Sequence, residues 1–195
     1  MIRTGITGGI GSGKSYVCRL LKERGISVYD CDTEAKRIMV EDADVRRRLT
    51  RLIGKEAYLR ARAKGSGETE YSLNKPVIAS FLMSSAENSE ALEDIVHPAV
   101  IDDFLCSGIE WVESAILFES GLDSFVDRVV VVTAPEEVRI ARIMERDGIS
   151  REKALDWIRC QLPQDYLTSR ADHIIVNDGQ APLLPQINAI LANTK

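Results

Sequence analysis

The stretch Gly8-Gly9-Ile10-Gly11-Ser12-Gly13-Lys14-Ser15 fits the pattern G-x-x-x-x-G-K-[ST], which is typical of a loop that binds the phosphates of a nucleotide. The run Ile2–Thr7 ahead of it predicts a strand, and the residues after it, with apolar Val17, Leu20 and Leu21, predict a helix. A strand, a glycine-rich loop and a helix in this order allow backbone N–H groups and the positive end of the helix dipole to point at one phosphate.

Two other interpretations of this stretch are weaker. It can be a turn with an incidental lysine, but the strand and helix patterns on either side argue against that. A dinucleotide-binding G-x-G-x-x-G motif cannot be placed, because its third glycine would fall on Lys14 or on Tyr16. Lys14 is instead predicted to bring a mobile charge to the terminal phosphates, and the hydroxyl of Ser15 to hold Mg²⁺.

Composition limits the class of protein. The chain has 195 residues, 45 % of them hydrophobic and 28 % charged, which is ordinary for a soluble globular domain. A net charge of -5 argues against a broad nucleic-acid surface, and no apolar run is long enough to predict a membrane span. The glycine-rich stretch interrupts any secretory signal, and the four cysteines form no C-x-x-C pair. We therefore predict a cytoplasmic protein with a small-molecule substrate, without nucleic-acid or membrane partners, that acts as a monomer.

Short apolar runs alternate with helical patterns along the chain, which predicts the α/β class. Several runs are almost continuously apolar, as Val129 to Val132 are, and this is typical of parallel strands covered on both faces. The predicted strands are Ile2–Thr7, Ser27–Asp30, Val112–Leu117, Arg128–Thr133 and His173–Val176. We predict a three-layer α/β/α core with a five-stranded parallel sheet in one domain, 1–195, whose nucleotide-binding core comprises 1–32 and 108–195.

Two further segments interrupt this core. Residues 33–107 are predicted to form a helical insertion, a lobe above the sheet edge, with turn residues at Lys64–Gly67 and at Asn74-Lys75-Pro76. Residues 135–163 predict two helices joined at Asp147-Gly148, with Ser150 capping the second, in the position of a closing lid. The segment 46–64 is strongly basic, so it either attracts an anionic acceptor or forms the solvated face of a helix.

Acidic residues follow the second predicted strand. Asp30 and Asp32 would lie at its carboxyl end, where ligands of open α/β sheets bind. One carboxylate would take or orient the proton of an attacking hydroxyl, and the other would act through a Mg²⁺-bound water. A helix N-cap is the alternative for Asp32, and the two roles are compatible.

Three arginines, at 139, 142 and 146, share one face of the helix predicted after Pro135. They would stabilise the charge of a transferring phosphoryl group, or they form a solvated stripe paired with nearby glutamates. Arg159 on the next helix is a weaker candidate of the same kind.

Three more sites have a functional and a structural interpretation. His97, before Pro98, would bind a substrate group or a freed backbone carbonyl. Glu119 would follow a strand and hold a Mg²⁺ water or the acceptor, or be a surface acid. The loop Asn177-Asp178-Gly179 would offer backbone groups to adenine, or be an ordinary turn.

In order along the chain, these pieces resemble the dephospho-CoA kinase family over residues 1 to about 191. The resemblance is carried by Thr7–Ser15, Asp30-Cys31-Asp32, Ile95-Val96-His97-Pro98, Arg146-Asp147-Gly148, Gln161 and Ile175–Gly179. It differs in details: Tyr16 stands where threonine is usual, and Arg139 where glutamine is common.

The resemblance implies ATP-dependent, Mg²⁺-assisted phosphorylation of the ribose 3′-hydroxyl of dephospho-CoA, giving coenzyme A and ADP in the last step of coenzyme A synthesis. It implies that Asp32 is the base, with Lys14, Arg142 and Arg146 as the other catalytic residues. Acceptor contacts are predicted at Asp32, His97 and Glu119. Nucleotide contacts are predicted at Gly9, Gly11, Ser12, Gly13, Lys14, Ser15, Tyr16, Asn177 and Gly179. A nucleoside or nucleotide kinase on the same core, and a nucleotide-dependent switch without transfer, are the alternatives; the D-x-x-G and N-K-x-D motifs of a GTPase are absent from the sequence.

Overall fold

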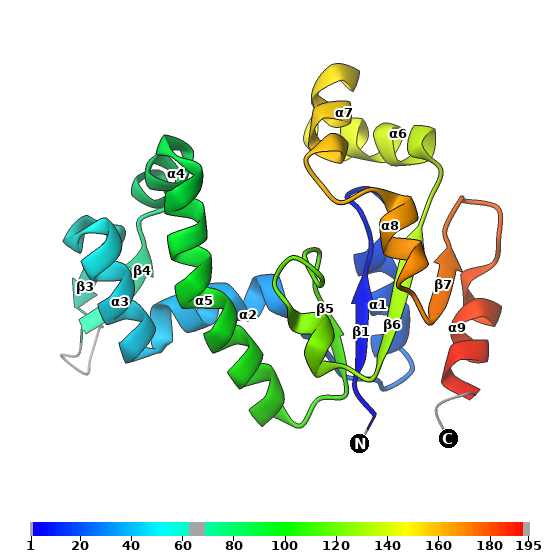
Figure 1. The fold of residues 1–195 in the computed structure, drawn as a ribbon, viewed down its shortest axis with the longest axis horizontal. Coiled ribbons are helices and arrows are strands. Elements are labelled where there is room, and N and C mark those ends of the chain that lie inside the picture. Colours follow the sequence, from blue (N-terminus) through cyan, green and yellow to red (C-terminus); the bar gives the residue numbers. More distant parts are fainter. Residues whose placement is uncertain (1, 63–68, 193–195) are drawn as a thin grey trace. The chain divides into compact units, whose positions relative to one another are not determined.

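The computed structural model describes residues 2–62 and 69–192. They divide into two compact units, one of Met1–Asp30 with Ile109–Lys195 and one of Cys31–Gly108 (Figure 1). The first unit contains the sheet and the second is the insertion. The turn predicted at Lys64–Gly67 lies outside the described residues.

The first unit is built on a parallel sheet in the strand order β2-β5-β1-β6-β7. The strands are β1 (Thr4–Thr7), β2 (Val28–Asp30), β5 (Trp111–Glu113), β6 (Arg128–Thr133) and β7 (His173–Val176). Each pairing is parallel, so all five carboxyl ends meet at one edge of the sheet. This arrangement confirms the predicted five-stranded parallel core.

Helices and loops cover both faces of this sheet. Helices α1 (Lys14–Lys22) and α9 (Leu183–Ala192) pack on one face, where Ile6, Leu21 and Ile187 belong to one buried cluster. The segment that follows β5, with the short helix η2 (Leu122–Phe125), and helix α8 (Gln164–Ser169) cover the other face. The nearly continuous apolar composition of the central strands is thus explained by burial on both sides.

Helices α6 (Glu136–Asp147) and α7 (Arg151–Arg159) form a pair joined at Gly148, as predicted. The hydroxyl of Ser150 accepts a hydrogen bond from the N–H of Lys153, so Ser150 caps α7. Their apolar faces share a small buried cluster, against which Ile10 of the glycine-rich loop also packs. The helix pair is therefore attached directly to the phosphate-binding loop.

The second unit contains four helices among its described residues: α2 (Cys31–Glu41), α3 (Ala43–Ile53), α4 (Lys75–Ser84) and α5 (Ala86–Ser107). It also contains a one-turn helix η1 (Lys55–Ala57) and an antiparallel hairpin, β3 (Tyr58–Arg62) with β4 (Thr69–Leu73). The hairpin was not predicted. Pro98 lies inside α5, which continues through it.

One predicted strand ends earlier than expected. The apolar appearance of 112–117 predicts one continuous strand, but β5 ends at Glu113 and Ala115–Ser120 form a turn. The hydroxyl of Ser114 accepts a hydrogen bond from the N–H of Ile116, which stabilises this turn. Glu119 is consequently an exposed turn residue and not the end of a strand.

Among the helices that the structure describes, none is long and apolar enough to cross a membrane.

Candidate active site

The glycine-rich loop connects β1 to α1. Gly13 is the residue before α1 and has φ +87°, a left-handed conformation that a side chain would strain. A Cβ there would also collide with the amide nitrogen of Asn177. A Cβ on Gly9 would lie 2.5 Å from an Arg139 guanidinium nitrogen. Backbone shape therefore favours glycine at position 13, whereas a side chain at position 9 would require the Arg139 guanidinium to move.

The loop presents unpaired backbone donors. The N–H groups of Gly11, Gly13, Lys14 and Ser15 donate to no other residue in the described part of the chain. Two of them belong to the first turn of α1, where N–H groups have no partner within the helix. Together with the helix dipole they make a site that favours an anion, as the sequence pattern predicts.

Lys14 and Ser15 meet a carboxylate that the sequence analysis missed. The ammonium nitrogen Nζ of Lys14 lies 2.6 Å from Oε1 of Glu113, and the Ser15 hydroxyl donates to the same oxygen at 3.1 Å. Glu113 ends β5, beside β1, and is buried. An acid that interrupts an apolar strand next to the loop strand is the signal in the sequence that identifies it.

Cys18 lies beside Glu113, and its thiol stays protonated there. The thiol lies on α1, one turn after Lys14, and only 2 % of it is exposed. Burial raises the pKa of Cys18 well above its ordinary value, and the charge of Glu113 raises it further. Cys18 is therefore a neutral thiol beside a carboxylate whose charge is balanced by Lys14.

Arg139, on α6, stabilises the glycine-rich loop through a hydrogen bond. Its Nε donates to the carbonyl of Ile10 at 2.8 Å, and only 6 % of the residue is exposed. Burial lowers the pKa of Arg139, which stays far above neutrality for a guanidinium. Arg139 thus satisfies a loop carbonyl on the side facing α6. The alternative interpretation, a solvated stripe of arginines, is excluded for Arg139 by its burial.

Three more side chains hold the loop. Arg142 donates to the carbonyls of Gly11 and Ser12 at 3.2 and 3.3 Å. Asn177, buried in the loop after β7, donates to the same Ser12 carbonyl at 2.8 Å and accepts from Arg142 at 3.3 Å. Gln161 accepts the N–H of Ile10 at 2.6 Å. Side chains from three separate parts of the chain therefore fix the backbone of the loop.

The remaining residues predicted on the nucleotide side differ in their surroundings. Arg146 is exposed and pairs with Asp147 at 2.7 Å. Tyr16 is exposed, with Arg19 over its ring. Ser12 is fully buried, and its N–H donates to Gly9, so here it shapes the loop. Gly179 has φ +86° in the turn after β7. Nucleotide contact by these four stays a prediction.

The predicted acceptor residues are placed as follows. Helix α2 begins at Cys31, so Asp32 lies within its first turn and Asp30, not Asp32, occupies the position before the helix. Asp32 is exposed, and Asp30 pairs in register with Glu113 across β2 and β5. His97 is half-buried within α5 of the insertion, and Glu119 is exposed. Their contact with an acceptor stays a prediction.

A parallel sheet with a phosphate-binding loop after its first strand, and a lysine, a serine and a buried acid at that loop, define a P-loop kinase. The sequence profile of the dephospho-CoA kinase family matches residues 2–182. A dephospho-CoA kinase from Bacteroides fragilis is 38 % identical over 98 % of this chain and 92 % of its own length. The chain belongs to the dephospho-CoA kinase family, which confirms the resemblance.

Solved structures share the fold of this chain. A crystal structure from Thermus thermophilus has a TM-score of 0.79 and 33 % identity, covering 100 % of this chain and 98 % of that one. A dephospho-CoA kinase from Campylobacter jejuni has a TM-score of 0.63 at 20 % identity, covering 98 % and 95 %, and so supports the fold alone.

Proposed function

We propose that this chain transfers the γ-phosphoryl group of ATP to the ribose 3′-hydroxyl of dephospho-CoA, giving coenzyme A and ADP. Membership of the family supports the reaction. The observation that supports it within the chain itself is the convergence of Lys14 and Ser15 on Glu113 at the end of the glycine-rich loop. The ammonium group, the hydroxyl and the carboxylate that meet there are the groups that a nucleoside triphosphate with its metal ion requires.

The residues at the loop suit a Mg²⁺ ion that arrives with the nucleotide. Mg²⁺ prefers oxygen donors and is usually held by one or two protein groups together with substrate phosphates and water. The Ser15 hydroxyl and the Glu113 carboxylate are such donors, and they already lie within hydrogen-bonding distance of each other. When bound, the ion would neutralise charge on the β- and γ-phosphates. Ser15, with Glu113 beside it, is the proposed metal site.

Lys14 is proposed to serve the terminal phosphates. Its ammonium group is held by Glu113 in a nearly buried position, so the positive charge is in place before the nucleotide enters. The free N–H groups of Gly11 and Gly13 would bind phosphate oxygens alongside it. Arg142 and Arg146 would add charge from α6. Asn177 and Gly179 would border the adenine.

Asp32 is proposed as the base. The reaction breaks the bond from the γ-phosphorus to the β–γ bridging oxygen and forms a bond to the 3′-oxygen, whose proton passes to the Asp32 carboxylate. Only one residue separates Asp32 from Asp30 at the end of β2, so the chain itself keeps the two Cα atoms within about 7.6 Å in any arrangement of the units. The insertion, with His97, and the exposed Glu119 would bind the acceptor.

Incubation of the protein with ATP, Mg²⁺ and a panel of acceptors tests this proposal. The panel is dephospho-CoA, adenosine, nucleoside monophosphates and shikimate. Mass spectrometry should find one added phosphate on dephospho-CoA alone, located on its ribose by fragmentation. A preference for a nucleoside monophosphate, or ATP hydrolysis without a phosphorylated acceptor, would overturn it. We also expect a cytoplasmic monomer, which sedimentation and cell fractionation would check.

A further inference from the structure

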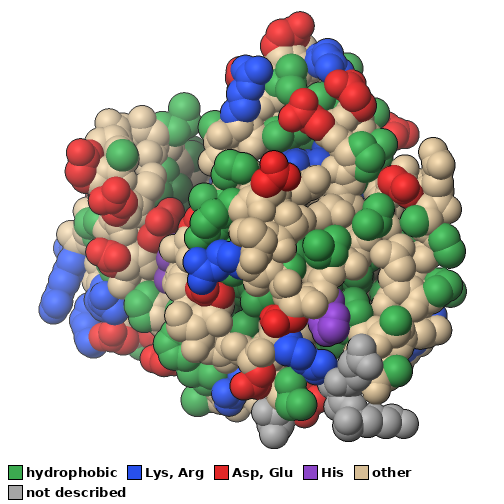
Figure 2. Space-filling view, turned by 45° about the vertical axis from the view of Figure 1, so that its right-hand side comes forward, with side chains coloured by type: hydrophobic (Ala, Val, Ile, Leu, Met, Phe, Trp, Pro, Cys, Tyr) green, Lys and Arg blue, Asp and Glu red, His purple; other side chains and the backbone are tan. Residues whose placement is uncertain are grey.

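The insertion contains a basic pocket that the proposed reaction does not use. It has a volume of about 290 Å³ and lies between α3 and the β3–β4 hairpin. Its lining includes five cationic side chains and no carboxylate, although the whole chain carries a net charge of -5. The cationic residues are Arg46, Arg47, Arg51, Lys55 and Arg60. Figure 2 shows Lys and Arg side chains gathered at its left edge, over the insertion.

The secondary structure brings these charges together. Ala43, Arg46, Arg47 and Thr50 recur at the spacing of one helical face on α3. On the hairpin, Arg60 is directly opposite Tyr71, so the two side chains share one face of the ribbon. The helix face and the ribbon face both line the pocket, so the cations converge because of the fold and not because they are neighbours in sequence.

Two of the arginines are held in fixed positions. Arg46 donates to the carbonyls of Val40 and Glu41 at 2.5 and 3.1 Å, at the end of α2. Its guanidinium lies 4.4 Å from the centre of the Tyr71 ring, and that of Arg60 lies 5.7 Å from the same centre. Cation–π contacts of this kind orient guanidinium groups without neutralising them. The charge of the pocket is therefore organised and remains available.

Three of the cations have no acidic partner. Within residues 2–62 and 69–192, Arg51, Lys55 and Arg60 form no salt bridge, whereas Arg47 pairs with Asp44. Elsewhere in the same unit the contrast is clear, because Arg37 contacts Glu34, Glu41 and Asp103. Like charges around one cavity repel each other, so an anion that enters the pocket would relieve this repulsion.

We infer that this pocket is a second anion site, for a small ligand with two or more phosphate groups. Arginine matches phosphate oxygens in paired hydrogen bonds, and several cations suit a ligand of several charges. A volume of about 290 Å³ accommodates a di- or triphosphate group but not a large organic body. The ligand class is therefore a free inorganic di- or triphosphate.

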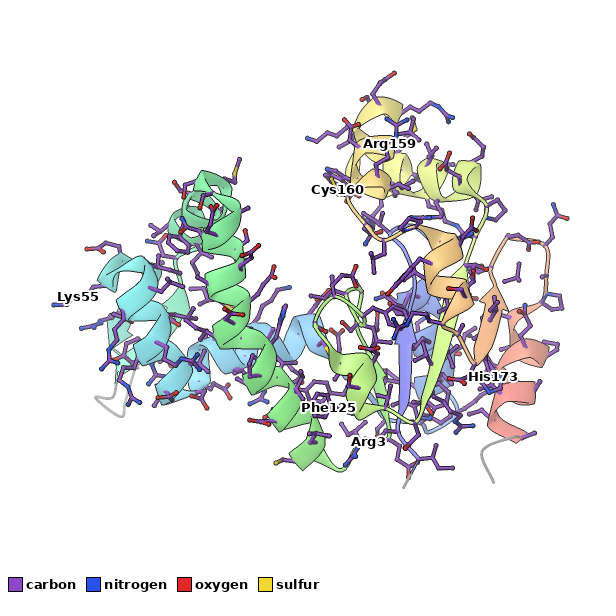
Figure 3. The ribbon with its side chains drawn as sticks, viewed as in Figure 1. Arg3, Lys55, Phe125, Arg159, Cys160 and His173 are labelled. Carbon is purple, nitrogen blue, oxygen red and sulfur yellow. The ribbon has the colours of Figure 1, made fainter. Side chains whose placement is uncertain are left out.

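The site is separate from the proposed reaction centre within the same unit. Arg46 binds the carbonyl of Glu41 at the end of α2, nine residues after Asp32, which is about 13 Å along a helix. Figure 3 shows Lys55 on the outer side of the insertion, away from the beginning of α2. The diphosphate of dephospho-CoA is only a few bonds from the hydroxyl that Asp32 would meet. The acceptor at Asp32 therefore leaves the pocket open for another ligand.

The test is a titration of the whole protein with inorganic tripolyphosphate, followed by amide chemical shifts and by calorimetry. We expect shifts at residues 43–60 and 69–73 in addition to those at the glycine-rich loop. In the triple variant Arg51→Gln, Lys55→Gln and Arg60→Gln the shifts in the insertion should disappear, and affinity there should fall by at least about 30-fold, because three charge-assisted contacts are removed. Shifts at the loop alone, or insertion shifts that persist in the triple variant, would overturn the inference.

A matched control separates this effect from a general loss of charge. Lys22→Gln, Lys36→Gln and Lys75→Gln remove three exposed cations outside the pocket and should leave binding in the insertion within about twofold. An equal loss in both triples would contradict a specific site. The pocket triple should also keep or raise the melting temperature, because repulsion is relieved; a fall would contradict the unbalanced charge that the inference assumes.

Enzyme kinetics distinguish two ligands for the pocket, a free di- or triphosphate and the diphosphate of dephospho-CoA. If the ligand is a free di- or triphosphate, the pocket triple keeps the KM for dephospho-CoA and the turnover number. A tenfold rise in that KM would assign the pocket to the acceptor and contradict a separate site. The tripolyphosphate titration does not depend on which acceptor the kinase prefers, so failure of the proposed function and failure of this inference are distinguishable.

Discussion

The glycine-rich loop and the basic pocket of the insertion differ in whether their cationic side chains have partners. At the loop, Lys14 is paired with Glu113 and Arg142 is bound to loop carbonyls. In the pocket, Arg51 and Lys55 have no acidic partner among the described residues. The loop is thus a balanced site in which a phosphate must compete with or join an existing carboxylate. The pocket is an unbalanced one, which any suitable anion stabilises.

The largest effect is expected when the positive charge at the loop is removed. We predict that Lys14→Ala lowers the rate of phosphoryl transfer by about 10³-fold, because charge developing on the transferred group loses its nearest cation. Steady-state ADP release with dephospho-CoA measures the rate. Lys22→Ala, on the exposed end of the same helix, is the control and should stay near the wild-type rate.

Stability must be separated from chemistry in that variant. Lys14→Ala leaves Glu113 buried without its partner, which destabilises the fold. The double variant Lys14→Ala with Glu113→Gln should recover thermal stability without recovering transfer. Recovery of transfer would show that Lys14 acts only by balancing Glu113.

The carboxylate itself provides the next test. Glu113→Gln keeps the size of the side chain and removes its charge, so we expect a loss of about 10²-fold in rate and a higher Mg²⁺ concentration for half-maximal activity. A Mg²⁺ titration of the initial rate measures both. Glu119→Gln should instead raise the KM for the acceptor with an unchanged Mg²⁺ requirement, and the reverse pattern would exchange the roles of the two acids.

A smaller effect is expected when Arg139, which donates a hydrogen bond to the loop, is replaced. Arg139→Ala leaves the Ile10 carbonyl without its donor, so the loop becomes less ordered. We predict that the KM for ATP rises about tenfold while the turnover number falls less than threefold, measured at saturating acceptor. Arg159→Ala, an exposed arginine on α7, is the control. An unchanged KM for ATP would remove Arg139 from loop positioning.

The smallest effect concerns pH and Cys18. Because its pKa is raised in the folded protein, the thiol stays neutral there while it ionises in the unfolded chain above about pH 8.5, so stability is lost as pH rises. Between pH 8 and 10 the wild type should lose about 1–2 kcal/mol of unfolding free energy more than Cys18→Ala does. Urea unfolding at both pH values measures this. Equal slopes in the two proteins would contradict a neutral buried thiol.

Much of the loop and sheet could be predicted because the information is local. The spacing of glycines, Lys14 and Ser15 encodes the loop, and unbroken apolar runs encode strands buried on both faces. Ser150 as a cap is predictable for the same reason, since a cap depends on residues within one helical turn.

What could not be predicted depends on contacts between distant parts of the chain. Glu113 lies 99 residues from Lys14, and its importance follows from the pairing of β5 with β1. The helical spacing places Arg139 on one face with Arg142 and Arg146, but its hydrogen bond to Ile10 is a tertiary contact that the spacing does not encode. The β3–β4 hairpin was missed because its alternation includes Arg60, which lines the basic pocket, in place of an apolar residue.

The most direct test of the account compares transfer and nucleotide binding in Asp32→Asn. Asparagine keeps the shape of the side chain but accepts no proton, so we predict that single-turnover transfer to dephospho-CoA falls at least about 10²-fold while the dissociation constant of ATP stays within about twofold. Loss of transfer with intact ATP binding would place Asp32 at the acceptor hydroxyl, separate from the loop. Transfer at the wild-type rate would contradict the proposed base and, with it, the mechanism.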